Sequence, residues 1–492
     1  MEFDNIITAI EETLISKKGP LIVILAKPTA FIKQYIEDLN NTLEQYQAGA
    51  RLTFSQKTWL SFCLTGILMV NAVCWAKFER VSLGDYKISA LSWMFRKSKI
   101  PWDKLLIASV RHILKKYGIT NGVLVLDESD RARSKNTKRI HKAHKQKHKA
   151  SGGYVNGQTI VLLLLVTDSI TVPVGFKFYM PDPAISAWTK EEKNLKKQGV
   201  PKSERPAKPE NDPDYPKKIQ LALLLLEEFR RNHPEISVRC VLADALYGSK
   251  EFMNGASDIF GGVQVVSQLK SSQNIRHRGT KKTIKDYFDI TNKGVDCTVT
   301  IRGGKVINTT VSSARLKVDA HEGEVLFVIA LKYEGEEKYR YLAATDVSWR
   351  TVDIIQAYSL RWLVEVFFED WKLYEGWGQE AKQCDEEGSS RGLILSLLID
   401  HCLLLHPEQK ACLENKTPVF TVGSLQRRAQ MDVLMECFQF LVQQEDPGEK
   451  LKEMGQAIKD VFQLMPSAKH MSGRILGRLE PTPSLSARYC SC

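Results

Sequence analysis

Four chemically different polar residues recur at helical spacing near the middle of the second half of the chain. The segment YSLRWLVEVFFEDWK, residues 358–372, contains Tyr358, Arg361, Glu365 and Lys372 at intervals of three, four and seven residues. At about 100° per residue these side chains share about 60° of arc on a helix, and the apolar residues lie opposite them. The plainer interpretation is a solvated face above a buried one. From this helix alone, a solvated face and a functional face both remain possible interpretations.

Two further acids close short apolar runs that are typical of buried strands. Asp127 ends GVLVLD at 122–127, and Asp244 ends VRCVLAD at 238–244. Strand ends on one sheet edge are where α/β proteins place their chemistry, although a single Asp after a strand is often a helix cap or turn residue.

Together with Glu365 from the later helix, Asp127 and Asp244 form a minimal set of hard oxygen ligands for divalent metal. Two Mg²⁺ ions held this way activate a nucleophile and stabilise a leaving oxygen in phosphoryl transfer. Glu128 and Asp130 compete with Asp127 for its place in this set.

The elements that must position these residues follow from hydrophobic periodicity. The first 118 residues look all-helical, with two helices over Ile88–Arg96 and Trp102–Tyr117. Strands and helices then alternate, with a solvated linker at 190–218, and residues 281–345 have the pattern of strands alone. The predicted strands are 122–127, 158–167, 169–181, 238–244 and 263–270, and the predicted helices are 219–231, one from Ser249, 351–374, 393–405 and 426–443.

The formal charge of +12 is unevenly distributed, because residues 131–149 contain nine Lys or Arg and no acid. Such a block is either a solvated loop or a phosphate-binding arm, whose DNA-binding candidates are Lys142, Lys145, Lys147 and Lys149. His141, His144 and His148 have a helical spacing that could suggest zinc. The neighbouring cations would repel a metal ion, so we favour the solvated or DNA-binding alternatives.

The composition indicates a soluble globular protein, with 43% hydrophobic and 26% charged residues. Ten cysteines form no CxxC pair, and the acidic N-terminus has no signal-peptide pattern, so we expect a reduced, cytoplasmic protein. Thr58–Ala76 is uncharged over a length that could span a bilayer. Because this segment contains several polar residues and has no second span beside it, we expect a buried core helix and no membrane. A membrane anchor remains the alternative.

The order of these elements resembles the ribonuclease-H-like core of DDE transposases. More narrowly, the chain resembles bacterial insertion-sequence transposases of the cut-and-paste group with a Y-x2-R-x3-E-x6-K signature, because Tyr358, Arg361, Glu365 and Lys372 match every spacing. The sequence LADALYGS around Asp244 also matches in character. The resemblance covers about residues 120–410. It implies an α/β fold with a ribonuclease-H-like mixed sheet, a β-rich insertion, and helical N- and C-terminal regions.

The resemblance also implies roles for individual residues. Asp127, Asp244 and Glu365 would be catalytic and hold two Mg²⁺ ions, for which Mn²⁺ could substitute. Tyr358, Arg361 and Lys372 would contact phosphates of the transposon end. Tyr341 aligns with an aromatic that stacks on a flipped base, with packing on its sheet as an equal alternative, and Trp362 is a second aromatic candidate.

The implied organisation has five parts. They are a helical DNA-binding region at 1–118, a first part of the catalytic core at 119–274, the insertion at 275–346, a second part of the core at 347–410, and a helical C-terminal region at 411–492 suited to dimerisation. The expected activity is metal-dependent cleavage at the ends of an insertion sequence and transfer of the 3′-OH ends into target DNA, by a homodimer on the DNA. The resemblance also implies a cytoplasmic location of the bacterial type, associated with the nucleoid. The alternative is a catalytically silent DNA-binding protein derived from a transposase.

Overall fold

The computed structural model describes residues 28–82, 85–133, 136–147, 153–168, 170–291, 293–300, 305–379, 383–406 and 422–461. The chain divides into two compact units, Met1–Phe440 and Leu441–Cys492. The helix α15 (Pro447–Val461) belongs to the second unit. Everything that positions the candidate site lies in the first unit.

The described N-terminal residues are helical, as the sequence predicted. The helices are α2 (Ala30–Tyr46), α3 (Phe54–Val70), α4 (Trp75–Val81), α5 (Ile88–Lys97) and α6 (Trp102–Lys116). The start of α3 is fixed by a capping box, in which the Thr53 hydroxyl accepts from the Gln56 amide and the Gln56 side chain accepts from the Thr53 amide.

The uncharged segment at 58–76 is divided between α3 and α4. Among the described residues no single helix is long and apolar enough to cross a membrane, and the pair α3 and α4 reaches that length only with a bend of 91° between them. Nearly the whole of α3 is buried, including Trp59, Phe62 and Ile67. The expected buried helix is therefore α3.

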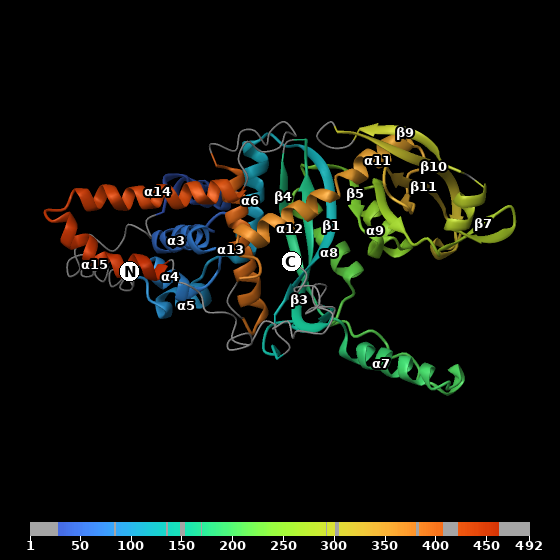
Figure 1. Ribbon diagram of the computed structural model, residues 1–492, viewed down its shortest axis with the longest axis horizontal. Helices are drawn as coiled ribbons and strands as arrows, with labels where there is room; N and C mark the ends of the chain where they lie inside the picture. The colour runs from blue at the N-terminus through green and yellow to red at the C-terminus, as the bar shows by residue number, and fades with distance from the viewer. Residues whose placement is uncertain are drawn as a thin grey trace, which may run out of the picture. The chain divides into compact units, whose positions relative to one another are not determined.

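A mixed sheet forms the centre of the first unit (Figure 1). Strand β1 runs antiparallel to β3 and parallel to β5, and β5 is parallel to β6; β4 is antiparallel to β3. This is the predicted ribonuclease-H-like arrangement of three antiparallel strands followed by parallel ones. The strands are β1 (Asn121–Ala132), β2 (His144–Lys147), β3 (Tyr154–Val166), β4 (Thr171–Tyr179), β5 (Ser237–Ala243) and β6 (Gln264–Leu269).

The β-rich residues after β6 extend the same sheet. Strand β12 pairs antiparallel with β6, and the order continues through β11, β10, β7 and β8, with β9 on β10. These strands are β7 (Asn274–His277), β8 (Thr280–Thr283), β9 (Val295–Thr300), β10 (Val306–Val318), β11 (Val325–Tyr333) and β12 (Arg340–Ala344). The expectation of strands alone was wrong at 284–291, where α10 (Ile284–Asp286) and a π-helical turn at Tyr287–Thr291 intervene.

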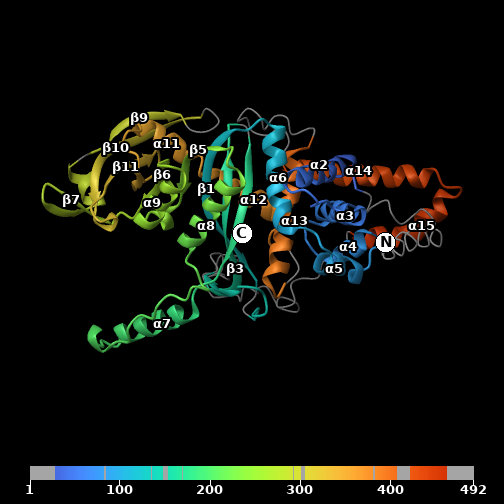
Figure 2. The ribbon, with the colours of Figure 1, turned by 180° about the vertical axis from the view of Figure 1, so that it is seen from behind.

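Helices cover both faces of the sheet. On one face α8 (Lys218–Asn232) and α9 (Lys250–Ile259) pack through Leu225 and Phe252 against inward residues such as Leu126. The other face is covered by α11 (Thr351–Ser359), α12 (Trp362–Tyr374) and α13 (Glu386–Leu404). The α12 helix lies in front of the sheet in Figure 1, and α8 lies in front of it in Figure 2. The remaining long helix is α14 (Val422–Val442), and all but its last two residues belong to the first unit.

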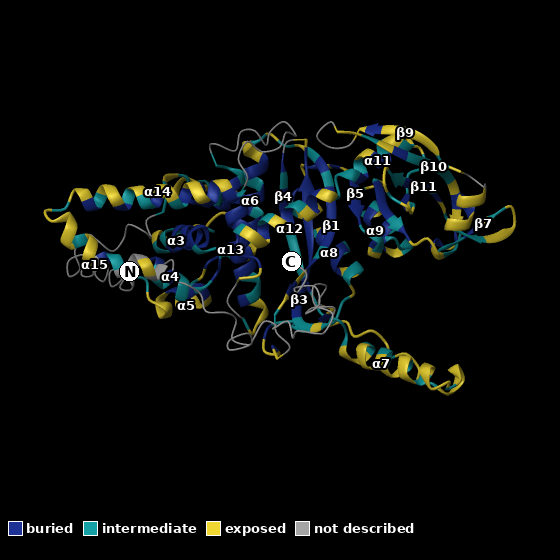
Figure 3. Cartoon of the chain, in the orientation of Figure 1, coloured by how far each residue is buried: buried dark blue, intermediate teal, exposed yellow. Residues whose placement is uncertain are grey.

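Two boundaries differ from the sequence prediction. Strand β1 does not end at Asp127 but continues to Ala132, because β3 pairs with it along that whole length. The predicted linker at 190–218 begins inside a helix, α7 (Pro183–Lys197), which has no buried residue and is capped by the Asp182 side chain. Its mostly exposed surface is visible in Figure 3 and explains why its sequence looked like a solvated loop.

Candidate metal centre

The register of β1 and β5 brings the two predicted aspartates together. These parallel strands pair from Asn121 opposite Ser237 up to Leu126 opposite Ala243. Asp127 and Asp244 are each the next residue, so both carboxylates lie where β5 ends and β1 continues, paired only with β3. The pairing places these two predicted acids next to each other at one edge of the sheet.

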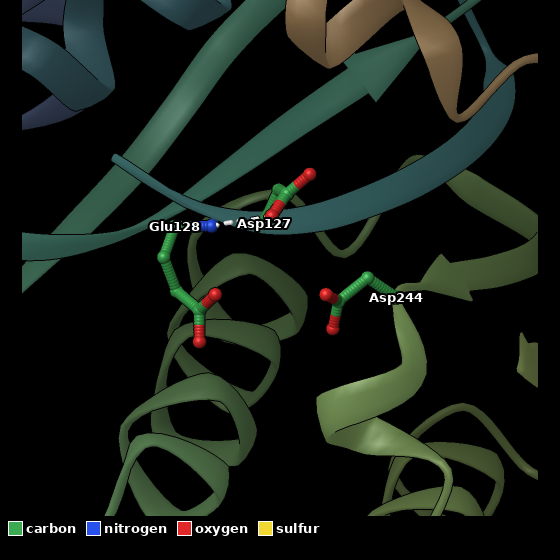
Figure 4. Close-up of side chains that lie close together, drawn as sticks. All are labelled: Asp127, Glu128 and Asp244. Atoms are coloured by element: carbon green, nitrogen blue, oxygen red, sulfur yellow. Dashed lines mark hydrogen bonds between the residues drawn. The ribbon is translucent and has the colours of Figure 1, made fainter. Parts of the chain in front are cut away.

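Glu128 joins the two aspartates. One carboxylate oxygen from each of Asp127, Glu128 and Asp244 lies within 4.8 Å of the others, which makes them a possible metal-binding group. Figure 4 shows the Asp244 side chain pointing towards β1, where Asp127 and Glu128 leave the strand on different sides. Consecutive strand residues normally point to opposite faces, and Asp244 can approach both because it lies beyond the end of its own strand.

Asp127 is held by two hydrogen bonds. Its Oδ1 accepts from the Glu128 amide at 2.8 Å, and its Oδ2 accepts from Arg361 Nη1 at 2.8 Å. Burial raises the pKa of this carboxyl to about 7, although the Glu128 amide and Arg361 act in the opposite direction. The charges of Asp244 and Glu128 raise it further. A cation among these oxygens would relieve that repulsion.

Glu128 and Asp244 are positioned by neighbouring elements. Glu128 Oε1 lies 3.2 Å from Lys218 Nζ at the start of α8 and accepts from the Tyr247 hydroxyl at 3.3 Å. Burial raises the pKa of Glu128, and Lys218 opposes the shift. Asp244 Oδ1 accepts from the Leu246 amide at 2.8 Å, which caps the short helical turn after β5. The Asp244 side chain therefore still acts as the turn former that a lone strand-end Asp often is.

The donor set fits a hard divalent cation. All three groups are carboxylates from two adjacent strands, and oxygen ligands of this kind are those that Mg²⁺ and Mn²⁺ prefer. Among the described residues no other group of His, Cys, Asp and Glu meets the same distance limit. Asp130, the other competitor, lies outside this group and accepts from the Thr159 hydroxyl at 2.6 Å.

Glu365 lies outside the three-acid group in this conformation. Its side chain is 54% exposed, and its Oε1 lies 3.8 Å from Arg361 Nη1. The same guanidinium nitrogen binds Asp127, so Arg361 stands between the first predicted acid and the third. The structure thus brings Arg361 to the acids and leaves Glu365 at the outer side of the arginine.

The signature segment is not one continuous helix. The α11 helix ends at Ser359 and α12 begins at Trp362, and the amides of Leu360, Arg361 and Leu363 bond to carbonyls three residues earlier. This tighter winding changes the phase of the helix, because three residues complete a turn there. The predicted common polar face is therefore interrupted between Tyr358 and Arg361.

Tyr358 is consequently buried, and its predicted contact with DNA phosphate does not fit its position. Its hydroxyl donates to the carbonyl of Ala243 at 3.5 Å, directly before Asp244. Burial raises the pKa of Tyr358 to about 12, with Arg361 opposing the shift. In this structure Tyr358 positions the end of β5 from the helix side.

The remaining predicted contacts on α12 are exposed. The Lys372 ammonium lies 5.5 Å from the centre of the Phe368 ring on the preceding turn. Trp362 is 66% exposed. Both side chains lie on the solvent side of α12, so a role for them in DNA binding remains a proposal.

Tyr341 lies in the hydrophobic core. It is only 4% exposed, pairs across the sheet with Leu269 and Ala330, and packs against Phe288 with ring centres 5.9 Å apart. Burial raises the pKa of its hydroxyl to about 12. Because neither ring face is open, base stacking does not fit this position, and the alternative of packing on the sheet describes it.

The basic segment is partly built into the sheet edge. Lys142 Nζ donates to the Phe178 carbonyl at 3.3 Å, whereas Lys145 lies 4.4 Å from the exposed Tyr154 ring and Lys147 is exposed. Lys149 lies outside the described residues. The helical spacing of the histidines was misleading, because His141 lies in a turn and His144 begins β2; His148 is also outside the described residues.

Sequence reasoning missed Lys218 and Tyr247, the two partners of Glu128. Tyr247 was available in LADALYGS, three residues after Asp244, where a helical turn would point it back to the strand ends. Lys218 gave no signal, because its approach to Glu128 depends on how α8 packs on the sheet.

Comparison with known proteins agrees with this geometry. Residues 53–286 match the family model described as DDE superfamily endonuclease. The matched part contains Asp127, Glu128 and Asp244 but ends before Tyr341 and the signature segment. No curated protein matches the chain. The match supports nuclease- or transposase-type activity on DNA, in a superfamily whose enzymes use divalent metals.

Proposed function

We propose that the chain is a DDE transposase of the cut-and-paste insertion-sequence group, which cleaves DNA at the element's ends and transfers the 3′-OH ends into target DNA. The observation that supports it most is the Asp127, Glu128 and Asp244 group at the end of β5, inside a matching DDE endonuclease region. The partners would be terminal inverted repeats and target DNA, bound by a homodimer in the bacterial cytoplasm.

Two chemical steps follow from this proposal. In the first, a water oxygen attacks the scissile phosphorus and the 3′ oxygen of the element leaves with a proton. In the second, that 3′ hydroxyl attacks a target phosphorus and releases a target 3′ hydroxyl. Two Mg²⁺ ions, replaceable by Mn²⁺, would supply charge neutralisation and an activated oxygen.

Asp127 and Asp244 would hold the metal, because their carboxylates already converge. Arg361 would move from Asp127 to a DNA phosphate, for which its guanidinium offers a bidentate fork. Its departure would free Oδ2 of Asp127 and open the path to Glu365, which is 3.8 Å from that same nitrogen. Lys372 would add a second phosphate contact further along α12.

The test begins with a search of the DNA on both sides of the reading frame for inverted repeats, and it uses a duplex that carries such a repeat. We expect the wild-type chain with Mg²⁺ to release a 3′-OH at the repeat end and to join it to a second DNA. Asp127→Asn and Asp244→Asn should bind the duplex but neither cut nor join it. Binding without cleavage by the wild-type chain would instead support a catalytically silent DNA-binding protein.

A further inference from the structure

The β7–β8 hairpin carries cations that the metal centre does not use. Residues 270–285, here called the basic hairpin, contain no Asp or Glu. Strands β7 and β8 pair antiparallel from Asn274 opposite Thr283 to His277 opposite Thr280. The cations of the basic hairpin are Lys270, Arg276, Arg278, Lys281, Lys282 and Lys285.

The tip of the basic hairpin extends past its neighbour in the sheet. Strand β10 pairs with β7 only at Ile275 and Arg276, and β8 is the last strand in the sheet order. The residues from Arg278 to Lys281 are exposed, as the hairpin near the β7 label shows in Figure 3. The tip is therefore a two-stranded ribbon with solvent around it.

The turn contains a residue that its conformation disfavours. Arg278 has φ of 49° and Gly279 has φ of 77°, so both central residues are left-handed, as in a type I′ turn. Glycine suits this turn, and Asn or Asp is the usual residue before it. An arginine with positive φ is strained, and such strain concentrates at functional positions. Turn formation alone does not explain a cation at this tip.

Two further cations lie directly opposite each other. Arg276 pairs with Lys281 across the ribbon, and like charges in that position repel. One carboxylate, Asp319, serves both, at 3.2 Å from Arg276 Nε and 3.2 Å from Lys281 Nζ. The two side chains remain 73% and 64% exposed. Positive charge therefore remains available to an external anion.

We propose that the basic hairpin binds the phosphate backbone of duplex DNA at a distance from the cleavage site. This inference rests on the proposed function, which supplies duplex DNA as the substrate. A two-stranded ribbon fits the major groove of B-DNA, and Lys and Arg neutralise its phosphates. The basic hairpin belongs to the same sheet as the acids, so both can face one duplex.

The sheet order sets the reach of this contact. Six strand spacings of about 4.8 Å separate β1 from β7, or about 29 Å along the sheet. At about 3.4 Å per base pair this distance corresponds to about eight or nine base pairs of duplex. A short duplex around the cut would not reach the basic hairpin, and a long one would.

The test compares two duplexes centred on the cut, one with about 5 and one with about 20 base pairs on each side. At about 3.4 Å per base pair, only the longer duplex spans the distance to the basic hairpin. The test variant is Arg278→Asn with Lys281→Gln and Lys285→Gln. The control is Lys193→Gln with Lys196→Gln and Lys197→Gln on the exposed α7, which removes the same charge. Affinity is measured against salt concentration for the full chain.

We expect the test variant to bind the long duplex more weakly, with a salt slope reduced by about 0.9 for each lost phosphate contact, and to bind the short duplex like the wild type. The control should match the wild type on both. Arg278→Asn alone should lower affinity for the long duplex while the melting temperature stays equal or rises, because Asn tolerates the left-handed turn. Unchanged affinity and slope in both hairpin variants would overturn this inference while leaving the proposed function intact. A wild-type chain that neither binds nor cuts either duplex would overturn both.

Discussion

At the scale of single residues, the identity of the third acid decides how the proposed metal centre would work. Glu128 lies with Asp127 and Asp244 as the chain is folded, whereas Glu365 is separated from them by Arg361. If Arg361 moves to DNA, Glu365 becomes the third ligand and Glu128 remains with Lys218 and Tyr247.

We predict that Glu365→Gln abolishes cleavage, because it removes a metal ligand, and that Glu128→Gln lowers cleavage only partly, because Lys218 and Tyr247 retain their places. The measurement is the rate of nicking at the repeat end in Mg²⁺ at saturating protein. Full cleavage by Glu365→Gln together with none by Glu128→Gln would assign the third ligand to Glu128 instead.

A second residue-scale feature is a buried acid pair behind α12. Glu375 follows α12 and is fully buried, and neither of its carboxylate oxygens has a hydrogen-bond partner in the described part of the chain. Burial raises the pKa of Glu375 well above its usual value, and Asp400 of α13 and Asp370 of α12 raise it further. Burial also raises the pKa of Asp400, with Asp370 adding to the shift.

We predict that this pair makes stability depend on pH. Because the folded pKa values are raised, the contribution is fully present below the ordinary carboxyl pKa and is lost as the pH rises towards the folded values. Melting temperature should therefore fall between pH 5 and pH 8, and Glu375→Gln should reduce that fall. Glu369→Gln, an exposed position on α12, is the matched control. Equal pH dependence in the two variants would contradict the prediction.

At the scale of elements, strand β12 places Tyr341 in the core beside Phe288. We predict that Tyr341→Ala lowers the free energy of unfolding by about 3–5 kcal/mol, as for other large aromatic truncations, and weakens every catalytic step together. Tyr341→Phe should keep nearly all of the stability. Chemical unfolding measures this directly. Loss of a late DNA-cleavage step alone, with wild-type stability in Tyr341→Ala, would restore the base-stacking role.

Within the basic segment at 131–149, the last described residues form the edge strand β2. Lys145 and Lys147 are exposed there, whereas Lys142 bonds to the Phe178 carbonyl. We predict that Lys145→Gln with Lys147→Gln reduces the salt slope of nonspecific DNA binding by about 0.9 for each lost phosphate contact. Lys142→Gln should have a smaller effect on binding. A slope unchanged by the double variant would return β2 to the solvated-loop interpretation.

Most elements could be predicted from local patterns, and the errors have physical causes. The strands ending at Asp127 and Asp244 were recognisable because buried parallel strands leave continuous apolar runs. The break in the helix between Ser359 and Trp362 could not be recognised in the sequence, because no Gly or Pro marks it. The contact of Tyr358 with Ala243, which accompanies the break, is a tertiary one. The place of Glu128 depends on β1 continuing beyond β5, which only the pairing with β3 reveals.

At the scale of the whole molecule, one sheet connects the metal centre to the β-rich residues. Strand β12 joins β6 by antiparallel pairing, so the predicted insertion at 275–346 is an extension of the sheet that holds Asp127 and Asp244. The resemblance implied the β-rich segment but not this continuity, because pairing between distant strands is a non-local property. The assignment of the remaining predicted regions to DNA binding and dimerisation stays a prediction.

The central claim is that the carboxylates at the end of β5 hold a divalent metal. Electron paramagnetic resonance of Mn²⁺ added to the full chain, in complex with the repeat duplex, counts the bound ions directly. We predict that the wild-type complex binds Mn²⁺ and that Asp127→Asn and Asp244→Asn lose most of this binding while retaining the duplex. Equal Mn²⁺ binding by the wild type and the Asp244→Asn variant would contradict the claim.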